Sequence, residues 1–107
     1  MWSLLRNVLE IAPIRSENGV TYRRLDTVSA RMEHFGALAY DHVSRRLLTL
    51  SPEPVGAVVV LLEKPLSVKE LTTNLFGLGY SLDETAVRDI VTRLVAAGIC
   101  HETHVDE

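Results

Sequence analysis

The stretch from Phe35 to Leu50, "FGALAYDHVSRRLLTL", constrains the fold more than any other part of the chain. Two apolar runs, 35–40 and 47–50, flank the polar segment 41–46, which is the pattern of a β-hairpin. Successive side chains of a strand point to opposite faces, and here both faces of each run carry apolar residues. We therefore expect the first run to be an inner strand covered on both sides. The second run is expected to form the second strand of the hairpin, Arg46–Leu50.

The segments before the hairpin carry weaker signals. Residues 20–32 predict one or two further strands. Residues 1–19 predict a separate unit, which consists of an amphipathic helix at Ser3–Ile11 and a turn around Asn18-Gly19. We therefore expect an N-terminal helix and turn at 1–19, followed by one folded domain at 20–107.

Three predicted helices follow the hairpin, and each begins at a serine. The first begins at Ser51, with Pro52 at its first helical position, and ends before Pro65. The second and third begin at Ser67 and Ser81, each with a glutamate three residues later, which is the spacing of a capping box. Glycines end both of these helices. The tail after the third helix predicts a short strand.

This order of elements predicts an α+β fold. We expect a small antiparallel three-stranded β-sheet followed by a three-helix bundle, with the extra N-terminal helix. The glycine-containing turn between the second and third helices is typical of a helix-turn-helix, so the arrangement is winged-helix-like. A chain of 107 residues, 47% of them hydrophobic, is long enough for one such domain.

The cellular setting follows from what the chain contains. No apolar run approaches the ~20 residues that a membrane-spanning helix needs. The single cysteine, Cys100, excludes an internal disulfide and fits a reducing compartment. We therefore expect a cytoplasmic protein with no membrane partner.

Catalysis and metal binding are not indicated. Cys100, His101 and His104 offer metal-ligand side chains within five residues, but they lie in the tail, where no fixed element holds them. The segment "GLGY" at 77–80 separates two helices, so it predicts a helix C-cap rather than a phosphate-binding loop. We expect no enzymatic activity, no cofactor and no metal.

A winged helix can bind DNA through its last helix, so a DNA-binding transcriptional regulator is an alternative. Residues 82–97 carry three acidic side chains against two arginines, and the whole chain has a net charge of −3. These charges suit a phosphate-lined groove poorly, so we expect no nucleic-acid partner.

The segment "RMEHFGALAY" (Arg31–Tyr40) has the pattern Arg-x-Glu-x-Phe-Gly-Ala-Leu-x-Tyr, and "YRRLD" precedes it while "RRLLTL" follows it. This region, roughly 22–62, resembles the peptide-recognition domains of ribosomal-peptide maturation (RiPP recognition elements), which include the pyrroloquinoline quinone biosynthesis protein D. It resembles most specifically the mycofactocin branch, the chaperones of mycofactocin precursor peptides. The resemblance implies a non-catalytic chaperone that binds the leader of a short precursor peptide and delivers it to a radical S-adenosylmethionine maturase.

The resemblance also implies a site. By this resemblance the strand Arg46–Leu50 is the edge of the sheet. The leader would add to it as an extra strand and lie between it and the last helix, and arginines would meet the acidic side chains of the leader. The apolar helix residues also follow core spacing, so an alternative is that they belong to the core. We expect structural roles for Phe35, Gly36 and Tyr40. Gly36 lies within a predicted strand, where a glycine indicates a bulge or a close backbone approach. The expected peptide-binding residues are Arg45, Arg46, Leu47, Leu48, Thr49, Leu50, Val87, Arg88, Ile90, Val91, Arg93 and Leu94.

Overall fold

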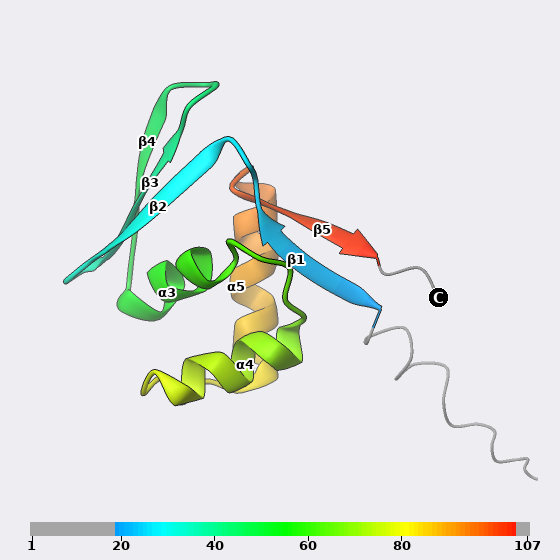
Figure 1. Cartoon of the computed structure of the whole chain (residues 1–107). Coiled ribbons are helices and arrows are strands. Elements are labelled where there is room, and N and C mark those ends of the chain that lie inside the picture. The colour runs from blue at the N-terminus through cyan, green and yellow to red at the C-terminus, as the bar shows by residue number, and fades with distance from the viewer. Residues whose placement is uncertain (1–18, 105–107) are drawn as a thin grey trace, which may run out of the picture.

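The computed structural model describes residues 19–104 (Figure 1). Four strands come first, three helices follow, and a fifth strand ends the described part of the chain. The strands form two separate antiparallel sheets. The elements are β1 (Val20–Arg24), β2 (Val28–Glu33), β3 (Gly36–Asp41), β4 (Arg46–Leu50), α3 (Glu53–Leu61), α4 (Val68–Gly77), α5 (Glu84–Ala96) and β5 (Cys100–His104).

The larger sheet has the strand order β2-β3-β4, so β3 is central and the other two strands are its edges. In the register of this sheet, Ala39 lies opposite Ala30 on one side and opposite Leu48 on the other. These three residues share the inner face, where Ala37 and Ala39 are buried. The hairpin expected at 35–50 is therefore confirmed as β3 and β4, with β4 at an edge.

The smaller sheet joins the two ends of the described chain. β1 pairs with β5, so that Val20 lies opposite His104 and Arg24 opposite Cys100. On its other side, β1 exchanges two backbone hydrogen bonds, of 2.8 and 3.0 Å, between Tyr22 and Leu66. The segment that connects α3 to α4 is thereby fixed against β1.

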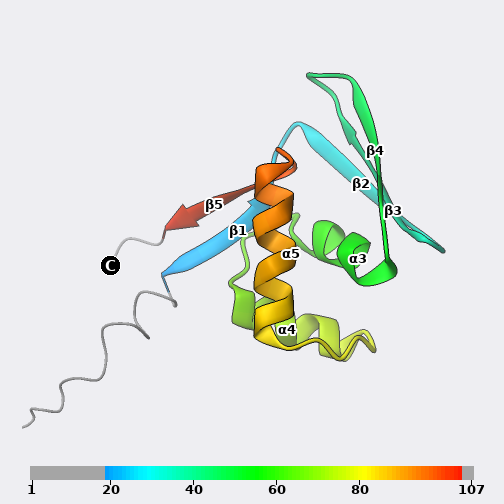
Figure 2. The same cartoon turned by 180° about the vertical axis from the view of Figure 1, so that it is seen from behind.

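Helix α3 packs directly on the central strand of the larger sheet. A glycine at position 56 permits this close approach, because a Cβ there would lie 2.5 Å from the carbonyl carbon of Gly36 and 2.7 Å from the nitrogen of Ala37. Figures 1 and 2 show α3 beneath the larger sheet, with α4 and α5 on the side of α3 away from it. The largest fully buried side chains are Leu62, Leu71, Leu75, Ile99, Val58, Val59, Val87 and Val91.

One of the three predicted helix starts is confirmed. In α4 the Ser67 hydroxyl accepts a hydrogen bond from the Glu70 N–H at 3.1 Å, and the Glu70 carboxylate accepts one from the Ser67 N–H at 2.8 Å. The start predicted for α3 is wrong, because its N-cap is Pro52 and no side chain caps it. The start predicted for α5 is also wrong, because Asp83 is the N-cap and accepts from the Ala86 N–H at 2.8 Å.

The predicted fold, a winged-helix-like domain with a single three-stranded sheet and an extra N-terminal helix, is wrong in its sheet arrangement. Residues 20–32 form two strands that belong to different sheets, because the chain turns between them at 25–27. The short strand expected in the tail is β5, and it pairs with β1. The order of strands before helices and the α+β class hold. The helix expected at Ser3–Ile11 lies outside the described residues.

Candidate functional site

The backbone of β4 directs hydrogen-bonding groups away from the sheet. The His42 N–H donates to the Thr27 carbonyl at 2.8 Å, so these two residues are a hydrogen-bonded pair at the end of the β2–β3 ladder. Such pairs alternate with non-bonded pairs along an antiparallel ladder, and this alternation makes Leu48 bond to β3. The N–H and C=O groups of Leu47 and Thr49 therefore point out of the free edge.

Side chains leave this edge accessible. Leu47 is 63% exposed and Thr49 is exposed, whereas Leu48 and Leu50 are half-buried on the inner face. After Arg46 the strand carries no charged side chain. Within residues 19–104, no strand pairs with the outer side of β4 and no side chain accepts a hydrogen bond from its outward N–H groups. From Leu47 to Leu50, β4 thus offers an uncharged strand edge that is unpaired within residues 19–104.

The hairpin loop fixes the start of β4. The Asp41 carboxylate accepts hydrogen bonds from the N–H groups of Val43, at 3.0 Å, and Ser44, at 3.4 Å. The bond from Val43 is the main cause of a lowered pKa for Asp41. Arg45 has a φ of 65° and its N–H donates to the Asp41 carbonyl at 2.7 Å, which closes the loop.

The four arginines expected at the site lie in two places. Arg45 and Arg46 are exposed at the start of β4, and an Arg46 Nη donates to the Ala97 carbonyl, at the C-terminal end of α5, at 3.2 Å. Arg88 and Arg93 lie on α5 itself, where Arg88 is half-buried and Arg93 forms an ion pair with Asp89 at 3.1 Å. Arg46 is the residue that ties the edge strand to the last helix.

The apolar residues expected from α5 lie mostly in the core. Val87 and Val91 have no exposed surface and Leu94 is buried, whereas Ile90 is half-buried at the margin of the core. Of these four side chains, Ile90 is the one with surface that a ligand can reach without rearrangement of the helix.

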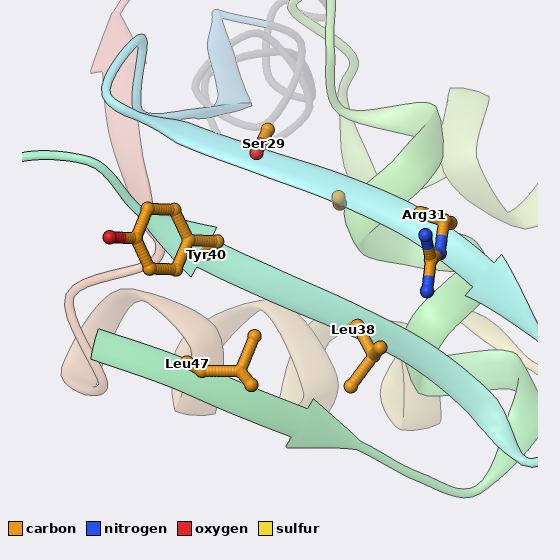
Figure 3. Close-up of a pocket in the computed structure, with 6 residues that line it drawn as sticks. Ser29, Arg31, Leu38, Tyr40 and Leu47 are labelled. Atoms are coloured by element: carbon orange, nitrogen blue, oxygen red, sulfur yellow. The ribbon is translucent and has the colours of Figure 1, made fainter. Parts of the chain in front are cut away.

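The outer face of the larger sheet carries a hollow of about 310 Å³ that is open to solvent (Figure 3). Leu38, Tyr40 and Leu47 provide its apolar lining, and Figure 3 shows all three on the same face of the sheet. Ser29 and Arg31 of β2 complete its rim. Among residues 19–104, the expectation that both faces of the first apolar run are covered is not met, because α3, α4 and α5 lie on the inner side of the sheet.

Sequence reasoning missed this hollow as a functional feature. Tyr40 was expected to be structural, and Leu38, Ser29 and Arg31 had no expected role. The sequence nevertheless carries a signal for the hollow, because Leu38 and Tyr40 are the apolar residues on the second face of the strand predicted at 35–40. The close backbone approach expected at Gly36 is confirmed, since a Cβ there would lie within 2 Å of the Leu50 carbonyl oxygen.

The tail residues considered for metal binding lie on β5. The alternation of a strand turns His101 to the face opposite Cys100. Burial raises the pKa of the Cys100 thiol to about 12, so the thiol stays protonated at neutral pH. Within residues 19–104, no three Cys, His, Asp or Glu side chains are grouped as metal ligands, and no helix is long and apolar enough to cross a membrane.

Comparison with known proteins identifies the family. The model of the peptide chaperone MftB family matches residues 21–101, which run from β1 through the hairpin and all three helices into β5. No curated protein and no solved structure matches significantly. The match contains both the free edge of β4 and α5, and it agrees with the resemblance carried by residues 31–40. The chain belongs to the peptide chaperone MftB family.

Proposed function

We propose that this chaperone binds the leader of a mycofactocin-type precursor peptide by strand addition to β4 and presents the bound peptide to a radical S-adenosylmethionine maturase. The observation that carries this proposal is the free edge of β4, where the N–H and C=O groups of Leu47 and Thr49 point outward. An extended peptide that pairs with these groups gains main-chain hydrogen bonds, each worth about 0.5–1.5 kcal/mol net.

The inner side of the added strand would face α5. Leu48 and Leu50 are half-buried on the inner face of β4, and Ile90 of α5 is half-buried at the margin of the core. In the proposal, the inward side chains of the peptide pack against these three residues. Val87, Val91 and Leu94 support this surface from the core beneath it.

The arginines give the site its preference for an acidic leader. Arg45 and Arg46 stand at the start of β4, and Arg88 and Arg93 stand on α5. A guanidinium pairs with a carboxylate through two parallel hydrogen bonds, which fixes position as well as charge. We propose that these four side chains set the position of the leader along the edge.

Delivery needs no chemistry in this domain. A leader held on β4 leaves the C-terminal part of the precursor free for the maturase, and tethering raises its local concentration at that enzyme. Ordering a disordered leader costs roughly 2–5 kcal/mol of the gross interaction. We therefore expect a dissociation constant on the order of 1 μM, about −8 kcal/mol. The division of the chain into a segment at 1–19 and a recognition domain at 20–107 stays a prediction.

Calorimetric titration with a synthetic leader peptide of a mycofactocin-type precursor tests the proposal. A parallel titration uses duplex DNA, and both are repeated at high salt. We expect micromolar peptide binding and no binding of the duplex. Salt-sensitive duplex binding without a peptide signal would instead support the DNA-binding alternative.

A further inference from the structure

The register of the larger sheet divides its outer face into two cross-strand rows. Tyr40 lies opposite Leu47 in one row, and Leu38 lies opposite Thr49 in the next. Directly opposed residues of neighbouring strands share a face of the sheet. A peptide strand added to β4 would continue both rows, whichever way it runs. One of its residues would lie opposite Leu47, and another, two positions along, opposite Thr49.

We propose that the hollow on the outer face is a specificity subsite for the precursor peptide, and that it takes a large apolar side chain from the peptide residue opposite Thr49. This inference rests on the proposed strand addition and adds a requirement on the leader. A strand at the margin of an antiparallel sheet ordinarily carries polar residues on its solvent face. The leader of this chaperone instead carries an apolar residue there.

The sizes of the side chains on β4 determine which peptide position reaches the hollow. Thr49 is short, so it leaves Leu38 accessible from the free edge. Leu47, which is 63% exposed, forms the neighbouring wall. It would be the diagonal neighbour of the peptide residue opposite Thr49, at about 7–8 Å, a distance that aromatic and long side chains span. Figure 3 shows Leu38 and Leu47 facing the same space.

The rim of the hollow favours an apolar occupant over a charged one. The Arg31 guanidinium already forms an ion pair with Glu33. The Ser29 hydroxyl is 3.1 Å from Nε2 of His42, whose ring packs edge-on against Tyr40. Because these polar groups have partners within the chain, the surface that gains most from being covered is the apolar lining.

The position of the hollow favours the peptide as its occupant over a second copy of the chain. Leu47 belongs both to the hollow and to the free edge, so the two surfaces are continuous. On the opposite side, β2 borders the hollow with Ser29, Ala30 and Arg31, and Arg31 is ion-paired with Glu33. The hollow is therefore apolar toward β4, where the peptide adds, and charged toward β2.

Two substitutions and a matched control test the subsite. Leu47→Thr and Leu38→Thr remove apolar lining while keeping residues that favour strands. Val43→Thr is the control, because Val43 is 74% exposed in the hairpin loop and does not line the hollow. The affinity of each variant for a fluorescent synthetic leader peptide is measured by anisotropy, and folding is checked by thermal unfolding. The peptide is then scanned by replacing each apolar residue with serine.

We expect Leu47→Thr to weaken binding about three- to tenfold, and Val43→Thr to change it less than about twofold. Serine at one peptide position should weaken binding to the unmodified chain but cost little further in Leu47→Thr, which identifies the residue that occupies the hollow. If the unmodified chain binds the leader and both lining variants bind it equally well, the subsite is wrong while strand addition stands. If Leu47→Thr changes sedimentation of the free chain and not peptide affinity, the hollow is an interface between copies.

Discussion

The two edges of the larger sheet share one central strand, yet they differ in what they offer an approaching peptide. On β2 the outward backbone groups belong to Ala30 and Met32, and the Arg31–Glu33 ion pair stands between and beside them. On β4 the outward groups belong to Leu47 and Thr49, and no charged side chain follows Arg46. Both edges are unpaired within residues 19–104.

The side chains of an edge strand, and not its openness alone, determine whether another strand can be added to it. Charged residues on an edge strand oppose pairing with another chain, because pairing would bring them against the added strand and out of water. β2 carries such protection at Arg31 and Glu33, whereas β4 carries a charge at its first residue, Arg46, and none from Leu47 to Leu50. An edge that is left without charges is an aggregation hazard unless a ligand uses it, which favours β4 as the binding edge.

Gly56→Ala should disturb both edges of the larger sheet at once, because position 56 packs against the central strand between them. Gly56→Ala would place a Cβ against the backbone of Gly36 and Ala37, so α3 must move away from β3. We expect a loss of unfolding free energy of about 3 kcal/mol, measured by urea denaturation. Gly77→Ala, at a glycine whose Cβ would meet no atom within 4 Å, is the control and should cost far less. Equal stability of the two variants would contradict the close packing of α3 on the sheet.

A proline substitution on each edge strand tests which of the two edges binds the leader. Thr49→Pro removes an outward N–H from β4, and Met32→Pro makes the same change on β2. We expect Thr49→Pro to weaken leader binding about thirtyfold, since a lost hydrogen bond leaves a peptide carbonyl unpaired at a cost of about 2 kcal/mol. Met32→Pro should leave the affinity unchanged in the same calorimetric titration. The reverse result would assign the peptide to β2.

The third prediction concerns charge beside the free edge. Arg46→Gln removes a cation that contacts the C-terminal end of α5 at Ala97. We expect leader affinity to fall about threefold at low salt and less at high salt, because an exposed ion pair is worth about 0.2–1 kcal/mol. Lys69→Gln, at an exposed lysine on α4, makes the same charge change away from the sheet. An equal loss in both variants would mean that overall charge, and not position, matters.

The last prediction concerns whether β2 can pair with an added strand once its charges are removed, and we expect only a small effect. Arg31→Thr with Glu33→Thr removes the ion pair that protects this edge and keeps residues suited to strands. We expect weak self-association or a second peptide site at least tenfold weaker than the first, seen by sedimentation and calorimetry. A variant that stays monomeric and binds one peptide would show that charge alone does not protect β2.

Local patterns predicted those parts of the fold that neighbouring residues determine. The hairpin and the capping box at Ser67 follow from spacing within a few residues, whereas the edge position of β4 follows from the family resemblance. The start of α5 was misassigned because Ser81 and Asp83 both suit an N-cap, and tertiary packing chooses between them. Leu82 lies just before Asp83 and packs against the core that contains Val87, which are the positions of a hydrophobic staple.

Local sequence patterns do not predict which strands pair when they are far apart in the chain. β1 and β5 are about eighty residues apart in sequence, and nothing in "CHETH" indicates its partner strand. The outer-face hollow was missed for a related reason, because it depends on which faces the helices cover. For the candidate site, the family resemblance points to the edge strand, whereas the outward direction of Thr49 rather than Leu48 required the register of the whole sheet.

The pairing of β1 with β5 has a practical consequence for handling this chaperone. The chain enters and leaves the described fold at one place, where Val20 lies opposite His104. Figures 1 and 2 show these strand ends on the side of the molecule away from β4. A fluorophore or surface linker attached beside Val20 or beside His104 would therefore start from the same corner. Held at either of these positions, the protein should keep β4 clear of the support.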